Sequence, residues 1–188
     1  MLEAAGGSEL STTRVAGARA RVGRAAALAA SLPAAEPGDA RAWASAVARR
    51  VVSRLRGRAP ALAGSRVRLR VVDDDAGSVH PTPARDVFPA ALRRMQVAVS
   101  DGEGTVDGAR TVLAVYCEPR ACKGRPGLSP ASEASVRQAL AEDPAAVVVI
   151  FGHPRLAAAV PGAQAVVAAW GGEGVMQEAA AACLAAEG

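Results

Sequence analysis

Most of the side chains that could do chemistry in this sequence lie in a few loops that follow apolar runs. The acidic triplet Asp73-Asp74-Asp75 directly follows one such run, and Asp73 and Asp75 form a D-x-D pair. In such a pair one carboxylate can act as a nucleophile and the other as an acid or base, and oxygen ligands of this kind suit Mg²⁺. The pattern therefore allows a magnesium-dependent phosphatase. The alternative is an acidic loop that forms ion pairs with nearby arginines such as Arg85.

Both histidines and the single lysine lie in loops of the same kind. His80 belongs to a proline-rich segment, His153 follows an apolar run in Phe-Gly-His-Pro, and Lys123 and Arg125 lie in the segment CKGRPG. No serine or cysteine stands with these histidines in a pattern that predicts a catalytic triad. Ser129 precedes a proline, which is typical of a helix cap rather than of a nucleophile.

Glycine and cysteine patterns predict no cofactor or metal. The glycine pairs at 102–104 and 172–174 lack the third glycine of a dinucleotide-binding fingerprint. The three cysteines, Cys117, Cys122 and Cys183, have neither zinc-binding spacing nor the even number typical of a disulfide framework. We therefore assign no catalytic residue, no metal ligand and no cofactor from the sequence.

The loops that carry these residues follow segments that we expect to be strands. These short runs, rich in β-branched residues, are 67–72, 96–99, 111–117, 146–151 and 165–170. Helical patterns alternate with them at about 85–94, 130–142 and 175–186. Strands that are apolar nearly throughout are typical of a parallel sheet with helices on both faces. The sequence thus predicts a three-layer α/β/α sandwich with a mostly parallel sheet of about five or six strands.

The sequence predicts that residues 1–39 form a separate N-terminal part. The Arg- and Ala-rich stretch at about 14–31 predicts a surface helix, and the linker LPAAEPGD follows it. Further on, Trp43, Val47, Val51 and Leu55 recur every four residues, which predicts an amphipathic helix packed on the core through that face. We therefore expect an N-terminal helix and linker at 1–39 and an α/β domain at 40–188.

Composition excludes several classes of partner. Apolar residues make up 51% of the 188 residues and aromatic residues 3%, so we expect a folded domain without a ring-lined platform for bases or sugars. The net charge of +4 lies almost entirely on arginines that are not interleaved with aromatics, so we expect no nucleic-acid partner. No apolar run approaches the roughly 18 residues that span a bilayer. We therefore expect no membrane contact, and we favour the cytoplasm over secretion.

The C-terminal third carries the most specific pattern. One apolar run leads into Phe151-Gly-His-Pro, and a second leads into Ala169-Trp170, followed by Gln177-Glu-Ala-Ala. This order and spacing resemble the end of the C-terminal domain of family 3 glycoside hydrolases. The segment 123–129 is similar to the loop that enters the preceding helix in that family. The segment 71–92 is similar to a part of its bacterial β-N-acetylglucosaminidase-like members, so the resemblance covers about residues 40–188.

The resemblance implies retaining β-glycosidase chemistry, in which a carboxylate nucleophile and a proton donor flank the glycosidic bond. It also implies that this chemistry lies elsewhere, because the family's nucleophilic aspartate and its Lys-His segment belong to an N-terminal (β/α)₈ barrel of about 250 residues. We expect this chain to be a fragment that packs on such a barrel, shapes the carbohydrate cleft and is inactive alone. Residues 1–39 would then be the end of the barrel domain or a linker.

Right-handed crossovers would place the loops after the parallel strands on one edge of the sheet, where α/β sheets usually bind ligands. The residues that we expect to approach the sugar are Asp73, Asp75, His80, Lys123, Arg125 and His153. Two other functions stay open. One is a stand-alone carbohydrate-binding or scaffold domain. The other is a phosphatase in which Asp73 and Asp75 resemble the D-x-D of haloacid-dehalogenase-type enzymes, although the threonine expected after that pair is absent.

Overall fold

The computed structural model describes residues 20, 39–78, 81–101, 108–119, 123–125 and 127–186. All elements discussed below belong to the unit Ala40–Gly188. The helix expected at about 14–31, the loop residue His80 and Cys122 lie outside the described residues.

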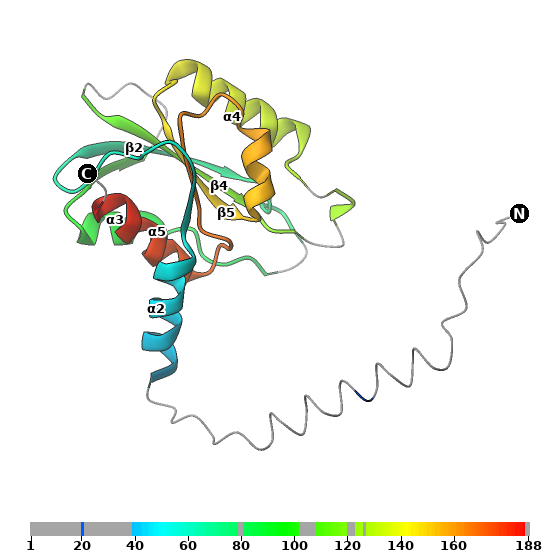
Figure 1. The fold of residues 1–188 in the computed structure, drawn as a ribbon. Helices are drawn as coiled ribbons and strands as arrows, with labels where there is room; N and C mark the ends of the chain where they lie inside the picture. The colour runs from blue at the N-terminus through cyan, green and yellow to red at the C-terminus, as the bar shows by residue number, and fades with distance from the viewer. Residues whose placement is uncertain are drawn as a thin grey trace, which may run out of the picture. The chain divides into compact units, whose positions relative to one another are not determined.

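Helices and strands alternate along this unit (Figure 1). In chain order the elements are α2 (Ala40–Val51), β1 (Ser53–Arg56), β2 (Arg66–Asp73), α3 (Val87–Arg94), β3 (Ala98–Asp101), β4 (Arg110–Cys117), α4 (Pro130–Glu142), β5 (Val147–Gly152), the 3₁₀ helix η3 (Pro154–Ala159), β6 (Ala165–Ala168) and α5 (Gly174–Ala186). The predicted α/β fold with a mostly parallel sheet is confirmed.

The strands of the described residues form one six-stranded sheet in the order β1-β6-β5-β4-β2-β3. Strands β2 to β6 run parallel to one another, and only β1, at one edge, runs antiparallel to its neighbour β6. The central strands β4 and β5 are buried along nearly their whole length, as their continuous apolar sequences predict. Their carboxyl ends pair Tyr116 with Phe151 and Cys117 with Gly152, which brings the loops after both strands together.

Two apolar clusters pack against the sheet. One cluster joins Val147, Val149 and Phe151 of β5 to residues of α3 and α5, and the other joins Val148 and Ile150 to residues of α4 and η3. Successive residues of a strand point to opposite faces, so these helices cover opposite faces of the sheet (Figure 1).

The helix predicted around Trp43 differs from the expectation. It ends at Val51, and Leu55 lies on β1 instead of continuing the helix. The four apolar residues expected to pack inward are exposed, Trp43 most of all at 70%, while Ala48 is the buried residue of α2. The prediction was wrong because the every-four-residue spacing identified the apolar face but not the face that the unit covers: α2 packs on α5, and its buried residue is the small Ala48.

Two strand boundaries also differ from the sequence pattern. The segment expected at 96–99 forms a strand only from Ala98, because Gln96 has a left-handed backbone with φ of 63°. The segment expected at 165–170 ends as a strand at Ala168, and Trp170 beyond it has φ of 64°.

Candidate functional site

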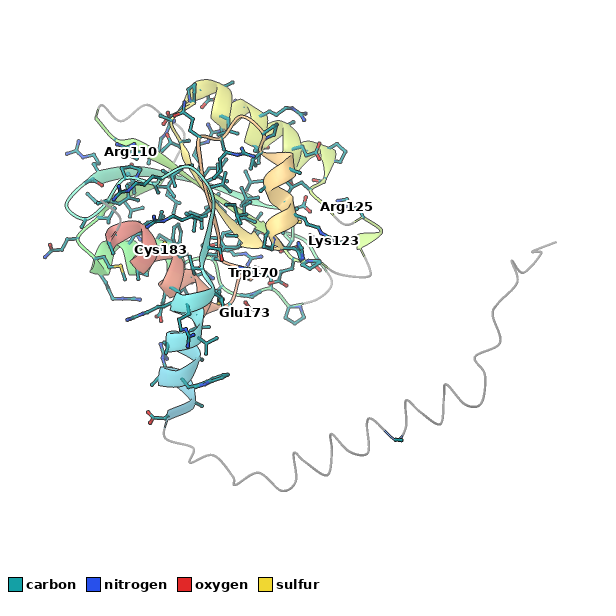
Figure 2. The ribbon with its side chains drawn as sticks, viewed as in Figure 1. Arg110, Lys123, Arg125, Trp170, Glu173 and Cys183 are labelled. Atoms are coloured by element: carbon teal, nitrogen blue, oxygen red, sulfur yellow. The ribbon has the colours of Figure 1, made fainter. Side chains whose placement is uncertain are left out.

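The loops that follow β2, β4, β5 and β6 meet at the carboxyl edge of the sheet. There the acidic triplet forms a network with cations from two other segments, and Figure 2 shows Lys123 and Arg125 on this side of the domain. Asp73 lies at the end of β2 and pairs with Arg85 in a two-pronged contact, Nε to Oδ2 at 2.9 Å and Nη2 to Oδ1 at 3.2 Å. The predicted ion pair between the acidic loop and Arg85 is therefore present.

Asp74 makes the largest number of these contacts, although the sequence reasoning did not select it. Its side chain is 1% exposed, and its Oδ1 accepts hydrogen bonds from the Ser129 backbone N–H at 2.9 Å and from Ser132 Oγ at 2.7 Å. Its Oδ2 accepts from Lys123 Nζ at 3.1 Å and from Arg125 Nη2 at 2.8 Å. A single carboxylate thus ties the β2 loop to the segment that enters α4.

Asp75 and Lys123 form a second contact in the interior of the network. The Asp75 side chain is fully buried, and its carboxylate lies 2.5 Å from Lys123 Nζ and 3.3 Å from Arg85 Nη2. The same carboxylate accepts the backbone N–H of Glu118, just after β4, at 3.1 Å. Asp75 therefore fixes the loop after β4, and Lys123 bridges two carboxylates while its own side chain is only 10% exposed.

The network shifts three pKa values in directions that follow from its contacts. Burial alone would raise the pKa of Asp74, but hydrogen bonds from Ser129, Ser132 and Lys123 outweigh it and hold that pKa far below its ordinary value. Burial would lower the pKa of Lys123, yet the two carboxylates raise it above its usual range. Burial raises the pKa of the Cys117 thiol, and the nearby Lys123 offsets only part of that effect.

This geometry gives no support to a phosphatase centred on Asp73 and Asp75. A nucleophilic carboxylate must be accessible and a magnesium site needs open oxygen ligands. Here Asp75 is buried, and both carboxylates are engaged by Arg85, with Lys123 also on Asp75. Among the described residues there is no group of three or more His, Cys, Asp or Glu side chains that could hold a metal ion.

A cavity of about 580 Å³ adjoins the network. Gly127 and Leu128 form part of its wall, and they lie between Arg125 and Ser129, the two residues held by Asp74. Residues that follow β5, His153 and Arg155 among them, line it as well, together with Glu133 of α4. The ion-pair network therefore positions one wall of a hollow at the edge of the sheet where α/β folds bind ligands.

Of the six predicted site residues, the structure brings four together. Asp73, Asp75, Lys123 and Arg125 share the network, whereas His153 lies at the cavity. His153 caps η3, because its Nδ1 accepts the backbone N–H of Arg155 at 3.1 Å. Whether any of these residues contacts a sugar stays a prediction.

Gln177 of α5 is a further buried residue that shapes this edge. Its Nε2 donates to the carbonyl oxygens of Ala84 and Gly172, both at 2.6 Å. Its Oε1 accepts from the backbone N–H of Phe88 at 2.9 Å and from the Tyr116 hydroxyl at 3.2 Å. Burial raises the pKa of Tyr116 well above its ordinary value, so this hydroxyl stays a donor. Gln177 thus connects strand β4 and helix α3 with the loop that follows β6 and the loop that precedes α3.

Comparison of the sequence with models of protein families gives no match, and comparison with curated proteins gives none either. Comparison of the structure does. The chain is similar to a family 3 β-N-acetylglucosaminidase from Paenibacillus sp. strain FPU-7, with a TM-score of 0.57 and 16% sequence identity over 95% of this chain. It is similar to the β-glucoside phosphorylase BglX, with a TM-score of 0.58 and 12% identity over 92% of this chain. The β-N-acetylglucosaminidase from Thermotoga maritima gives a TM-score of 0.51 and 14% identity over 75% of this chain.

This chain has the fold of one part of the family 3 glycoside hydrolases. It spans 38%, 35% and 31% of those three chains, so each contains a large part that has no counterpart here. The likeness predicted from the Phe151 to Gln177 pattern is therefore confirmed at the level of the fold.

Proposed function

We propose that this chain is the C-terminal domain of a family 3 glycosidase that hydrolyses β-N-acetylglucosaminides. The observation that carries the proposal is the match of nearly the whole chain, 95%, to only 38% of a β-N-acetylglucosaminidase of that family. The order of the Phe151, Trp170 and Gln177 motifs supports the same assignment independently. Residues 1–39 would be the end of the barrel domain or the linker that leads to it.

In this proposal the two carboxylates that attack and protonate the glycosidic bond belong to the barrel. The chain described here would bind part of the carbohydrate and form one side of the substrate cleft. Asp74, Asp75 and Lys123 have side chains that are at most 10% exposed, so they act by holding loops in place. Asp73 and Arg125, at 21% and 37% exposure, and His153 at the cavity are the predicted residues that can reach a sugar hydroxyl.

The exposed apolar side chains of α2 support a docked partner domain. Trp43, Val47 and Val51 lie four residues apart on one face of the helix, and Leu55 follows on β1 with 38% of its surface exposed. Apolar side chains grouped on a surface are typical of interaction sites. We assign this face to the barrel, because the similar enzymes carry the greater part of their chains outside the region matched here. Replacing Trp43 and Val47 by serine should weaken association with a barrel domain and leave the stability of this unit unchanged.

A panel of aryl glycosides tests the proposed activity. The native polypeptide, captured from its source cell with an antibody to this domain, should hydrolyse 4-methylumbelliferyl N-acetyl-β-glucosaminide faster than the corresponding β-glucoside. The 188-residue chain alone should release no fluorophore from either substrate. Turnover of neither substrate by the native polypeptide, or turnover by the isolated chain, would show that the proposal is wrong.

If the native polypeptide binds N-acetylglucosamine without hydrolysing any glycoside, the function is that of a stand-alone carbohydrate-binding domain. The cavity beside His153 is the observation that keeps this second function in view. A calorimetric titration with N-acetylglucosamine, performed beside the aryl-glycoside assay, separates the two functions.

A further inference from the structure

Trp170 presents its indole ring on a strained turn at the carboxyl edge of the sheet (Figure 2). Its backbone φ is 64°, and the N–H of Gly171 donates to the carbonyl oxygen of Ala169 at 2.8 Å, which closes a three-residue turn around Trp170. A γ-turn with positive φ at its centre is rare and strained, and a bulky residue adopts it less readily than glycine does. Trp170 is 52% exposed, and its Nε1 donates a hydrogen bond to Ser53 Oγ at 3.4 Å, so part of the side chain packs on the domain and part faces solvent. Backbone strain of this kind is found most often at functional positions.

His153 connects the indole ring to the cavity. The two ring centroids lie 6.2 Å apart in an edge-on arrangement with an interplanar angle of 61°. The Nδ1 of His153 accepts the Arg155 backbone N–H, so the neutral imidazole carries its hydrogen on Nε2, where it can donate. Arg155 and Glu133, which also line the cavity, add a donor and an acceptor. A half-exposed indole ring thus lies beside His153, which lines a hollow that also carries a donor and an acceptor group.

We propose that Trp170 and the cavity beside His153 form a carbohydrate subsite. One pyranose ring would stack its apolar face on the indole, and hydroxyl groups of the same or the next ring would bind His153 Nε2 and the polar groups of the cavity. The volume of about 580 Å³ is in the range of small-molecule sites. The class of ligand rests on the proposed glycosidase function, whereas the position of the site rests on the turn, the exposed ring and the cavity. Trp170 is one aromatic side chain and not a platform of several, so the proposal agrees with the aromatic content of 3%.

Tryptophan fluorescence tests this subsite directly. The chain contains two tryptophans, and the variant Trp43→Phe leaves Trp170 as the only one. Titration of this variant with methyl N-acetyl-β-glucosaminide and with methyl β-glucoside should give a saturable change in emission for at least one sugar. Titration with glycerol serves as the control for polyols without a ring.

Two variants separate binding from folding. Glycine adopts positive φ without strain, so Trp170→Gly should keep the thermal midpoint of the wild type yet weaken sugar binding by at least about tenfold in calorimetry. His153→Ala should weaken binding about tenfold by removing one hydrogen bond to the ligand. Trp43→Phe, on the exposed face of α2, should bind as tightly as the wild type.

An emission spectrum of folded Trp43→Phe that does not respond to any sugar would overturn the subsite. A spectrum that changes only when a barrel domain is added would also overturn it, because Trp170 would then be a contact between domains. Failure of the subsite and failure of the proposed function are distinguishable. If aryl glycosides are hydrolysed but the Trp170 emission does not change with sugar, only the subsite proposal is wrong. If the Trp170 emission changes with sugar but no aryl glycoside is hydrolysed, only the glycosidase proposal is wrong.

Discussion

Replacing Asp74 by asparagine tests whether the ion-pair network holds the carboxyl edge together. The Asp74 carboxylate accepts hydrogen bonds from Ser129, Ser132, Lys123 and Arg125 at 2.7 to 3.1 Å and is 1% exposed. Asparagine keeps the shape but loses the charge and one acceptor atom. Removing one partner of a buried ion pair costs about 3–5 kcal/mol. Lys123 would still be paired with Asp75 in this variant, so we expect a loss of unfolding free energy at the lower end of that range, about 3 kcal/mol.

Urea unfolding followed by circular dichroism measures this loss. With a slope of about 2 kcal/mol per molar, the midpoint should fall by about 1.5 M while the slope stays unchanged. Asp86→Asn is the matched control, because Asp86 is exposed and its side chain makes no capping hydrogen bond to α3. Its midpoint should equal that of the wild type.

The difference between wild type and Asp74→Asn should depend on pH in one direction. The folded pKa of Asp74 lies far below its ordinary value of 3.8, so its ionised form contributes stability that is present above that value. This contribution decreases once the pH falls below the ordinary value and disappears only below the folded pKa, so the difference between the two midpoints should narrow as the pH falls from about 5 to about 2. Equal midpoints for the Asp74 and Asp86 variants at neutral pH, or a difference that persists unchanged at pH 2, would refute this account of the network.

Two further substitutions, each with a control variant, and one alkylation reaction probe the same edge. Gly152→Ala should lower the unfolding free energy by about 2 kcal/mol, because a Cβ there would lie 2.2 Å from the Cys117 carbonyl oxygen. Gly162→Ala, where a Cβ meets nothing within 4 Å, should be neutral in the same urea unfolding. Gln177→Leu should cost about 3 kcal/mol through its lost hydrogen bonds, whereas Gln138→Leu on the exposed side of α4 should leave the midpoint unchanged. Burial and a raised pKa should keep Cys117 unmodified by iodoacetamide at pH 8, and peptide mass mapping that finds it alkylated in the folded chain would contradict this.

The sequence carried enough information to predict the central part of the fold. The apolar runs of β4 and β5 are typical of buried strands, and both strands are buried. Ser129 before Pro130 predicts the start of α4, and in the structure Ser129 Oγ accepts the Ser132 N–H as a helix cap does. Parallel strands place their carboxyl ends at one edge, so the proximity of Asp75 to Lys123 also followed from topology.

Other features depend on contacts that spacing does not encode. Three adjacent aspartates look alike in a sequence, and only the loop conformation turns Asp74 toward Ser129 and Ser132. The exposure of Trp43 depends on which face of α2 the rest of the unit covers, and here small residues rather than large ones make that contact. The sequence shows Trp170 only as part of the Ala-Trp motif, because its positive φ and its half-exposed ring depend on the conformation of the loop after β6.

The size and activity of the native polypeptide test the central claim most directly. An immunoblot of the source cell with an antibody to this domain measures the mass of the intact protein. Adding a barrel of about 250 residues predicts a band of roughly 47 kDa or more, and the same captured band should hydrolyse an N-acetyl-β-glucosaminide. A band at 18.9 kDa that neither hydrolyses the glycoside nor co-purifies with a barrel protein would contradict the assignment to a glycosidase.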